Sequence, residues 1–158
     1  MNELSHVDAQ GNVSMVDVSE KNPTLRSATA QSIVYLPHEL LEKFSNNDIH
    51  TKKGSVFQTA IIGGIMAAKK TGELIPLCHP LGLDDCKIGI HFNENEELVI
   101  NCTATVTAKT GVEMEALVGA SIAALTVYDM CKAVSQHIVI KETMLIEKTG
   151  GKHEFKRK

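Results

Sequence analysis

An aspartate and a lysine near the end of a long apolar stretch are the residues best suited to acid–base chemistry. Asp129 and Lys132 are three positions apart, which places them on one face of a helix, and apolar Val127 and Met130 lie beside them. A carboxylate near a helix C-terminus opposes the helix dipole. The apolar stretch predicts that this end is buried, and a residue that breaks a local rule at a buried site often marks function. The pair could exchange protons with a ligand or form a salt bridge at the helix end, and the spacing fits both. A Schiff-base role for Lys132 is less favoured, because nothing else indicates a carbonyl substrate.

Two glutamates lie at the opposite end of the same stretch. Glu113 and Glu115 flank Met114 in a first helical turn, where the dipole stabilises anions, although they could also accept hydrogen bonds from a guanine-like edge. A rise of about 1.5 Å per residue separates Glu115 from Asp129 by about 21 Å. Reacting groups must approach within about 3.5 Å. If both helix ends function, we therefore expect a homo-oligomer with its site between subunits.

A loop held by two prolines carries the third candidate group. Leu77, Cys78 and His79 lie between Pro76 and Pro80, in an apolar segment that is predicted to press against the core. His79 could bind a substrate or donate to a phosphate, or it could be hydrogen-bonded for structural reasons. A zinc site at Cys78 and His79 is not favoured, because adjacent residues do not match the usual ligand spacing. No metal site is predicted.

Cationic side chains at the edges of the predicted elements form a fourth group. If they converge, they would hold a phosphate or triphosphate; singly, each is more simply a solvated surface charge. No Walker A or G-x-G-x-x-G motif occurs, so the ordinary nucleotide-binding folds are not indicated. The group comprises Arg26, Lys53, Lys69, His79 and Lys132.

Length and composition fit one globular domain. The 158 residues are 43% hydrophobic and 22% charged, and the formal charge of −3 argues against general nucleic-acid binding. The N-terminal residues contain no apolar signal segment. The four cysteines form no C-x-x-C pair and are interpreted as reduced thiols, so we expect a cytoplasmic protein. A single domain over 1–158 is expected, with an N-terminal arm at 1–22 and a polar tail at 150–158.

A long helix is predicted to organise this domain. Residues 111–134 contain no proline, and residues 116–131 are apolar or small almost throughout. A helix that is apolar on all sides is a buried helix. The apolar run is about 16 residues long, short of the roughly 20 needed to cross a bilayer. No membrane-spanning segment is therefore predicted.

Strands and further helices complete the predicted order. A short helix starts at Pro37, a basic loop follows at 50–54, and Ser55 caps a helix that packs closely through Gly63-Gly64 and ends at Gly72. The segment 73–83 is predicted to be irregular. The order favours an α+β fold, a ferredoxin-like sandwich with an antiparallel sheet packed against helices. Strands are predicted at 24–36, 86–92, 98–108 and 138–146, the second and third forming a hairpin.

Four segments together resemble the cyclic pyranopterin monophosphate synthase family, also called molybdenum-cofactor biosynthesis protein C. They are KTGVEMEAL, LTVYDMCKAV, LIPLCHPL and MVDVS, and the resemblance extends from about His6 to Lys152. It implies a ferredoxin-like subunit in a homohexamer built as a trimer of dimers. It also implies a lyase that rearranges (8S)-3',8-cyclo-7,8-dihydroguanosine 5'-triphosphate, the product of a radical GTP cyclase, to cyclic pyranopterin monophosphate and pyrophosphate. No cofactor is implied.

The resemblance also implies roles for individual residues. Asp129 and Lys132 match the family's catalytic pair. A one-residue shift would exchange Lys53 with Lys52, or Lys69 with Lys70. The substrate-side matches are Leu77, Cys78, His79, Met114 and Glu115, with Glu113 beside them, and the phosphate-side matches are Lys53, Lys69 and Arg26. The alternatives to an enzyme are a non-catalytic module that binds a nucleotide or phosphate, and a purely structural oligomer.

Overall fold

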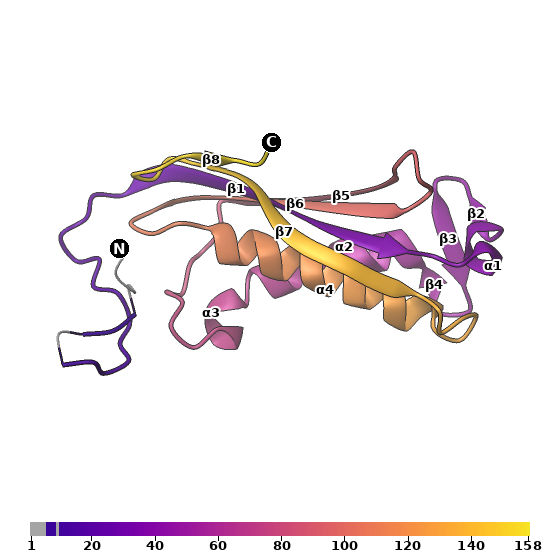
Figure 1. The fold of residues 1–158 in the computed structure, drawn as a ribbon, viewed down its shortest axis with the longest axis horizontal. Helices are drawn as coiled ribbons and strands as arrows, with labels where there is room; N and C mark the ends of the chain where they lie inside the picture. The colour runs from indigo at the N-terminus through magenta and orange to yellow at the C-terminus, as the bar shows by residue number, and fades with distance from the viewer. Residues whose placement is uncertain (1–5, 9) are drawn as a thin grey trace.

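The strand β1 lies in the middle of a five-stranded sheet in which every neighbouring pair of strands is antiparallel. The computed structural model describes residues 6–8 and 10–158, so residues 1–5 and 9 of the predicted arm lie outside the described residues. Two long helices, α2 (Val56–Ala68) and α4 (Glu113–Cys131), cover one face of the sheet (Figure 1). From one edge to the other the strands are β5 (Asp85–Phe92), β6 (Leu98–Ala108), β1 (Thr24–Tyr35), β7 (Val139–Thr149) and β8 (Phe155–Lys156).

The chain order confirms the predicted ferredoxin-like α+β sandwich. The main elements follow one another as β1, α2, β5, β6, α4 and β7, which is the β-α-β-β-α-β order of that fold. The β5–β6 hairpin was predicted within one residue of its observed bounds. The helices that alternate with the strands are α2 (Val56–Ala68) and α4 (Glu113–Cys131).

Small residues bring the two long helices into direct backbone contact. A Cβ atom added to Gly64 of α2 would lie 2.7 Å from the carbonyl oxygen of Gly119 in α4, closer than real Cβ contacts allow. On its other side Gly119 faces the sulfur of Cys102, which would lie 2.5 Å from an added Cβ. The predicted close packing at Gly63-Gly64 is thus confirmed, and the core is dense where α2, α4 and the sheet meet.

Helix α4 is not buried on all sides, which corrects the prediction. Its 19 residues pack against β1, β6, β7 and α2, but Leu125 is 52% exposed and Met114 is also exposed. On the adjacent α2, Ile62 is 58% exposed and Met66 is also exposed. By length and composition alone α4 could cross a membrane, contrary to expectation, although half of the qualifying window is buried inside the molecule. An apolar surface on α2 and α4, comprising Ile62, Met66, Met114 and Leu125, is therefore open in a single chain.

A small sheet between β1 and α2 was not predicted. The helix expected from Pro37 is a single turn, α1 (His38–Leu41), and the expected basic loop at 50–54 is part of a hairpin. Asn46 and Asn47 adopt left-handed φ angles of 51° and 61°, which favour a tight hairpin turn over a continuing helix. The ring of Phe44 packs edge-on against Phe92. The three strands of this sheet are β2 (Phe44–Ser45), β3 (Asp48–Thr51) and β4 (Gly54–Ser55).

The segment after α2 differs from the prediction in one respect. Helix α2 ends at Ala68, and Gly72 lies inside a further helical turn, α3 (Thr71–Leu74), instead of closing α2. The hydroxyl of Thr71 donates to the carbonyl of Ala68 and links the two helices. A Cβ at Gly72 would lie 3.0 Å from the Cα of Pro80, so this turn packs directly on the proline-held loop. Glu73 and Leu74, the first two residues of the segment 73–83 that was predicted to be irregular, belong to this turn, whereas residues 75–83 are irregular, as predicted.

The C-terminal residues also differ from the prediction. Strand β7 continues three residues beyond the predicted end and reaches Thr149, and the tail returns to pair with β7 as β8. Gly150 has a φ angle of 84°, and a Cβ there would lie 1.9 Å from the carbonyl oxygen of Leu25. Only glycine fits so close to the β1 backbone, and the turn directs the residues after it back over the end of β1.

A buried carboxylate, that of Asp48, fixes the start of α2. Ser55 caps this helix, as predicted: its hydroxyl accepts a hydrogen bond from the Gln58 amide at 3.2 Å. Asp48 accepts hydrogen bonds from the Phe57 amide at 2.8 Å, from the Ile49 amide at 2.6 Å, and from the Ser55 hydroxyl. Burial alone would raise the pKa of Asp48, but these donors outweigh burial and lower it below 3.8. Asp48 therefore stabilises the fold as a carboxylate.

We expect Asp48→Asn to lower the free energy of unfolding by about 2 kcal/mol. The asparagine amide has one acceptor oxygen and cannot accept hydrogen bonds from all of these donors, and hydrogen bonds to a charged acceptor contribute most to stability. Since the pKa of Asp48 is lowered by folding, its contribution is complete above pH 3.8 and is lost as the pH falls through the lower folded pKa. Denaturant unfolding of both proteins at pH 7 and below pH 3 checks this. A difference that did not shrink in acid would contradict the assigned charge.

Candidate active site

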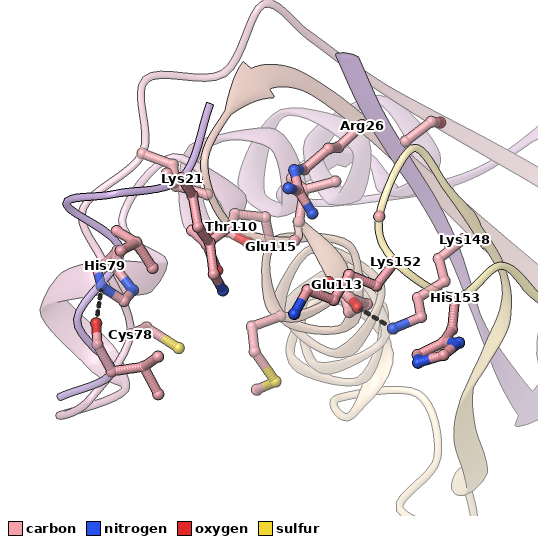
Figure 2. Close-up of a pocket in the computed structure, with 18 of the residues that line it drawn as sticks. Lys21, Arg26, Cys78, His79, Thr110, Glu113, Glu115, Lys148, Lys152 and His153 are labelled. Atoms are coloured by element: carbon pink, nitrogen blue, oxygen red, sulfur yellow. Dashed lines mark hydrogen bonds and ion pairs between the residues drawn. The ribbon is translucent and has the colours of Figure 1, made fainter. Parts of the chain in front are cut away.

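A pocket of about 850 Å³ lies where α4 begins. Its walls come from five separate parts of the chain: the N-terminal arm, the start of β1, the proline-held loop, the segment entering α4, and the end of β7 with the turn after it (Figure 2). Its size is within the range of pockets that hold small molecules. Because segments distant in sequence converge here, no single motif reveals the pocket.

The pocket brings together seven of the predicted site residues. The proline-held loop and the first turn of α4 each supply three of them, and Arg26 of β1 supplies the seventh. Their roles stay predictions, but their convergence in one hollow is a property of the structure. The seven are Arg26, Leu77, Cys78, His79, Glu113, Met114 and Glu115.

The two glutamates of α4 have different environments. Glu113 forms an ion pair with Lys148 of β7 at 2.7 Å. Glu115 is only 3% exposed, and none of the ion pairs among the described residues includes it. Burial raises the pKa of Glu115, and the nearby charge of Glu113 raises it further. A buried carboxyl without a cationic partner is suited to accept a hydrogen bond from a ligand or to hold a proton.

The loop residues Cys78 and His79 are both half-buried in the pocket wall. Burial raises the pKa of the Cys78 thiol, with a further contribution from the charge of Glu115, so Cys78 is not an activated nucleophile. The Nε2 atom of His79 lies 2.8 Å from the carbonyl oxygen of Val16 in the N-terminal arm (Figure 2). His79 therefore makes a structural hydrogen bond in this chain, which is one of the roles considered for it.

The side chain of Arg26 is held in the pocket wall by backbone carbonyl groups at the end of β6. Its Nε donates to the carbonyl of Ala108 at 3.0 Å, and Nη2 donates to that of Lys109 at 3.3 Å. A guanidinium carries five N–H groups, so donors remain for a ligand. The fixed position suits recognition of a phosphate or carboxylate.

Sequence reasoning missed five lysines and histidines of the pocket. His6 and Lys21 come from the arm and Lys148 from β7, while Lys152 and His153 follow the turn at Gly150. The two adjacent glycines at 150 and 151 are a turn signal that could have indicated that the basic tail folds back. Of these residues, only Lys152 and His153 belong to the predicted polar tail at 150–158, and that prediction gave them no role in a site.

The predicted catalytic pair lies at the other end of α4. Asp129 contacts Lys132 at 2.8 Å and Lys53 at 2.9 Å, and Lys53 also donates to the Asp129 backbone carbonyl at 3.2 Å. The side chains of Asp129 and Lys132 are 55% and 53% exposed, so the expected buried environment is wrong for a single chain. Lys53 reaches this cluster from the β3–β4 turn, which places Lys53 beside Asp129.

Two cations explain why a carboxylate is tolerated at this helix end. The hydrogen bond from Lys132, followed by that from Lys53, lowers the pKa of Asp129 to about 2. The same contact raises the pKa of Lys132. Asp129 is therefore an anion and Lys132 an ammonium group near neutral pH.

Lys69 lies apart from both groups. It lines a second, smaller hollow of about 430 Å³, together with residues between Leu81 and Cys86. The five predicted cationic residues thus do not all converge within one chain. Arg26 and His79 line the main pocket, Lys53 and Lys132 surround Asp129, and Lys69 lines the second hollow.

Fold and pocket together define a class of protein: a ferredoxin-like α+β protein with a basic pocket large enough for a nucleotide-sized anion. Comparison with known proteins is more specific. The profile of the MoaC family matches residues 15–151, and the chain belongs to that family.

Relatives with similar chain length share about half of the residues. The cyclic pyranopterin monophosphate synthase of Xanthomonas axonopodis pv. citri is 50% identical over 96% of this chain and 92% of its own length. That of Bacillus subtilis is 50% identical over 99% of this chain and 94% of its own length. The molybdenum cofactor biosynthesis bifunctional protein of Synechocystis is 49% identical over 94% of this chain but only 44% of its own length.

Proposed function

We propose that this protein is a cyclic pyranopterin monophosphate synthase. It is a lyase that converts (8S)-3',8-cyclo-7,8-dihydroguanosine 5'-triphosphate to cyclic pyranopterin monophosphate and pyrophosphate. The observation that carries the proposal is the convergence of the two segments 77–79 and 113–115 in one basic pocket, in a chain that shares half its residues with synthases of that name.

The charge of the pocket supports a triphosphate ligand. Arg26, Lys21 and Lys152 come from three separate segments and line one hollow. Formation of a cyclic monophosphate requires that a substrate hydroxyl attack the α-phosphorus, so that one P–O bond forms while the bond to pyrophosphate breaks. Fixed cations stabilise the negative charge that develops on the departing pyrophosphate.

Glu115 supports recognition of the purine-derived ring. Its carboxyl is buried in the pocket and is not neutralised by a described ion pair, so a ligand with N–H groups would satisfy it. Glu113 already pairs with Lys148 and instead fixes the wall between α4 and β7. We therefore assign the direct contact to Glu115.

We infer that the catalytic pair comes from another copy of the chain. Asp129 is fourteen positions from Glu115 on one straight helix, about 21 Å away, which exceeds the reach of one reacting group. The apolar surface on α2 and α4 leaves room for a second subunit against the helices. We propose a homohexamer, a trimer of dimers, in which Asp129, Lys132 and Lys53 of one subunit complete the pocket of the next.

In that assembly Lys132 acts as the general acid and base of the rearrangement. Its contact with Asp129 keeps it protonated, so it first gives a proton to the ring that opens and later accepts one when the new ring closes. Asp129 holds the ammonium group in position. Burial against a neighbour would lower the pKa of Lys132 toward neutrality and ease both transfers.

A link to the radical GTP cyclase of the same pathway follows from the substrate. The relative in Synechocystis is named as a bifunctional protein of molybdenum cofactor biosynthesis, and the matched part covers 44% of it, which supports the pathway but does not identify the partner enzyme. A cytoplasmic location is part of the proposal and is supported by the free thiols of Cys78 and Cys86, which are only half-buried and suit a reducing compartment.

Incubation with the cyclised dihydro-GTP tests the function directly. We expect one pyrophosphate for each substrate consumed, with formation of cyclic pyranopterin monophosphate, and no pyrophosphate from GTP itself, because GTP lacks the rearrangeable ring. Coupled phosphate detection and product chromatography measure both. Saturable binding without pyrophosphate release would instead show a non-catalytic nucleotide-binding module, and absence of any ligand effect on melting would indicate a structural oligomer.

A further inference from the structure

Part of the N-terminal arm lines the pocket, and the side chains of residues 15–18 alternate in burial. Val16 and Val18 are half-buried and line the pocket, whereas Met15 and Asp17 point outward and are exposed. This alternation resembles that of an extended strand, but no backbone ladder to the main sheet holds residues 14–22. The arm must therefore be held by other contacts.

Two side chains of the body hold the arm through its backbone carbonyls. Nε2 of His79 lies 2.8 Å from the Val16 oxygen, and Nζ of Lys109 donates to the Ser19 oxygen at 2.9 Å. A carbonyl oxygen only accepts, so Nε2 of His79 carries the proton in this contact. The arm is thus attached on both sides of Val18.

The arm delivers one cation to the pocket. After Ser19 the chain turns, with the Lys21 amide bonded to the Val18 carbonyl at 3.1 Å, and the Lys21 side chain lines the pocket (Figure 2). Lys148 in the same pocket is paired with Glu113, whereas none of the ion pairs among residues 6–8 and 10–158 includes Lys21. Its charge is therefore available to an anionic ligand.

We propose that His79 is a positioning residue which fastens the arm over the pocket, so that Lys21 binds the polyphosphate of the ligand. This inference rests on the proposed function for the nature of the ligand. This role differs from a direct contact between His79 and the substrate. The Nε2 atom of His79 is already bonded to the arm, and His79 affects the ligand through the position of Lys21. His79 and Lys21 are then energetically coupled although they are separate in sequence and play different parts.

A double-mutant cycle tests the coupling with GTP as the probe, by calorimetry at fixed salt. Lys21→Ala is expected to raise the dissociation constant about tenfold, as for loss of one charged contact. His79→Ala should produce a similar rise, and the double variant should bind no more weakly than Lys21→Ala alone. The inference would be overturned if the rise in the dissociation constant of the double variant were the product of the two single rises. It would also be overturned if Lys21→Ala bound GTP with wild-type affinity.

A conservative variant separates positioning from proton chemistry. The amide nitrogen of glutamine can replace Nε2 as a donor, so His79→Gln should restore GTP binding and should protect backbone amides of residues 14–22 from hydrogen exchange as in the wild type. His79→Ala should expose them. His91→Ala, an exposed histidine of β5, is the matched control and should change neither measurement.

The two proposals fail in different ways. If exchange in the arm were unchanged by His79→Ala, the positioning role would be wrong, even in an active synthase. If pyrophosphate were never released from the cyclised substrate while GTP binding still showed the coupling, the proposed function would fail and the arm contact would stand.

Discussion

Lys132→Ala is expected to lower kcat by about a thousandfold or more and to leave the fold unchanged. Loss of a positioned general acid lowers the rate by about 10²- to 10⁴-fold, and loss of its charge beside the reacting rings lowers the rate further. The side chain is 53% exposed in one chain and its ion-pair partner is Asp129, so its removal leaves no buried group unsatisfied. Initial rates of pyrophosphate release and circular dichroism together measure both expectations.

The controls for this variant are chosen from the same protein. Lys43→Ala replaces an exposed lysine that lies outside both pockets, and it should retain the wild-type rate. Lys132→Arg keeps the charge but has a far higher pKa, so it should retain binding and lose turnover. Product formation within threefold of the wild type in Lys132→Ala would show that the lysine has no catalytic role.

Two inactive variants are expected to regain activity when their subunits are mixed. If a pocket takes Glu115 from one chain and Lys132 from a neighbour, some mixed sites contain both wild-type residues. With random association of Glu115→Gln and Lys132→Ala chains in equal amounts, about a quarter of all sites are intact. We therefore expect roughly a quarter of wild-type activity after joint refolding, where each variant alone has almost none.

The mixing experiment needs a separate measure of assembly. Light scattering should give a hexamer for the wild type, both variants and the mixture, because neither substitution alters the apolar surface on α2 and α4. Mixing Lys132→Ala with Asp129→Asn chains is the matched control: both residues lie on the same helix end, so no site regains the intact pair. A monomeric wild-type enzyme with full activity would contradict the shared site.

Much of the fold was predictable because hydrophobic periodicity marks long elements. The alternating residues of β5 and β6 and the apolar run of α4 indicated the hairpin and central helix within a few residues. The small sheet was missed because β2 and β4 have only two residues each, too few for a period. Their position depends on the left-handed turn at Asn46-Asn47 and on contacts of Phe44, which are tertiary effects.

The site was predictable in residue types more than in arrangement. The loop residues 77–79 and the first turn of α4 were singled out, and the structure places them in one pocket. The burial expected for Asp129 and Lys132 was wrong in one chain because apolar neighbours in sequence lie on other faces of the helix. Lys21 and Lys152 could not be found from local pattern, because arm and tail reach the pocket through long-range contacts.

The backbone contact between Gly64 and Gly119 has a mechanical consequence. Since the main chains of α2 and α4 approach closely at these glycines, there is little room for one helix to shift against the other, and we expect the pair to move as one rigid unit. In the proposed hexamer, one end of this helix pair binds a ligand and the other end completes the site of an adjacent subunit. The length of the pair then fixes the distance between two sites, so inserting one helical turn would displace residues of both sites at once.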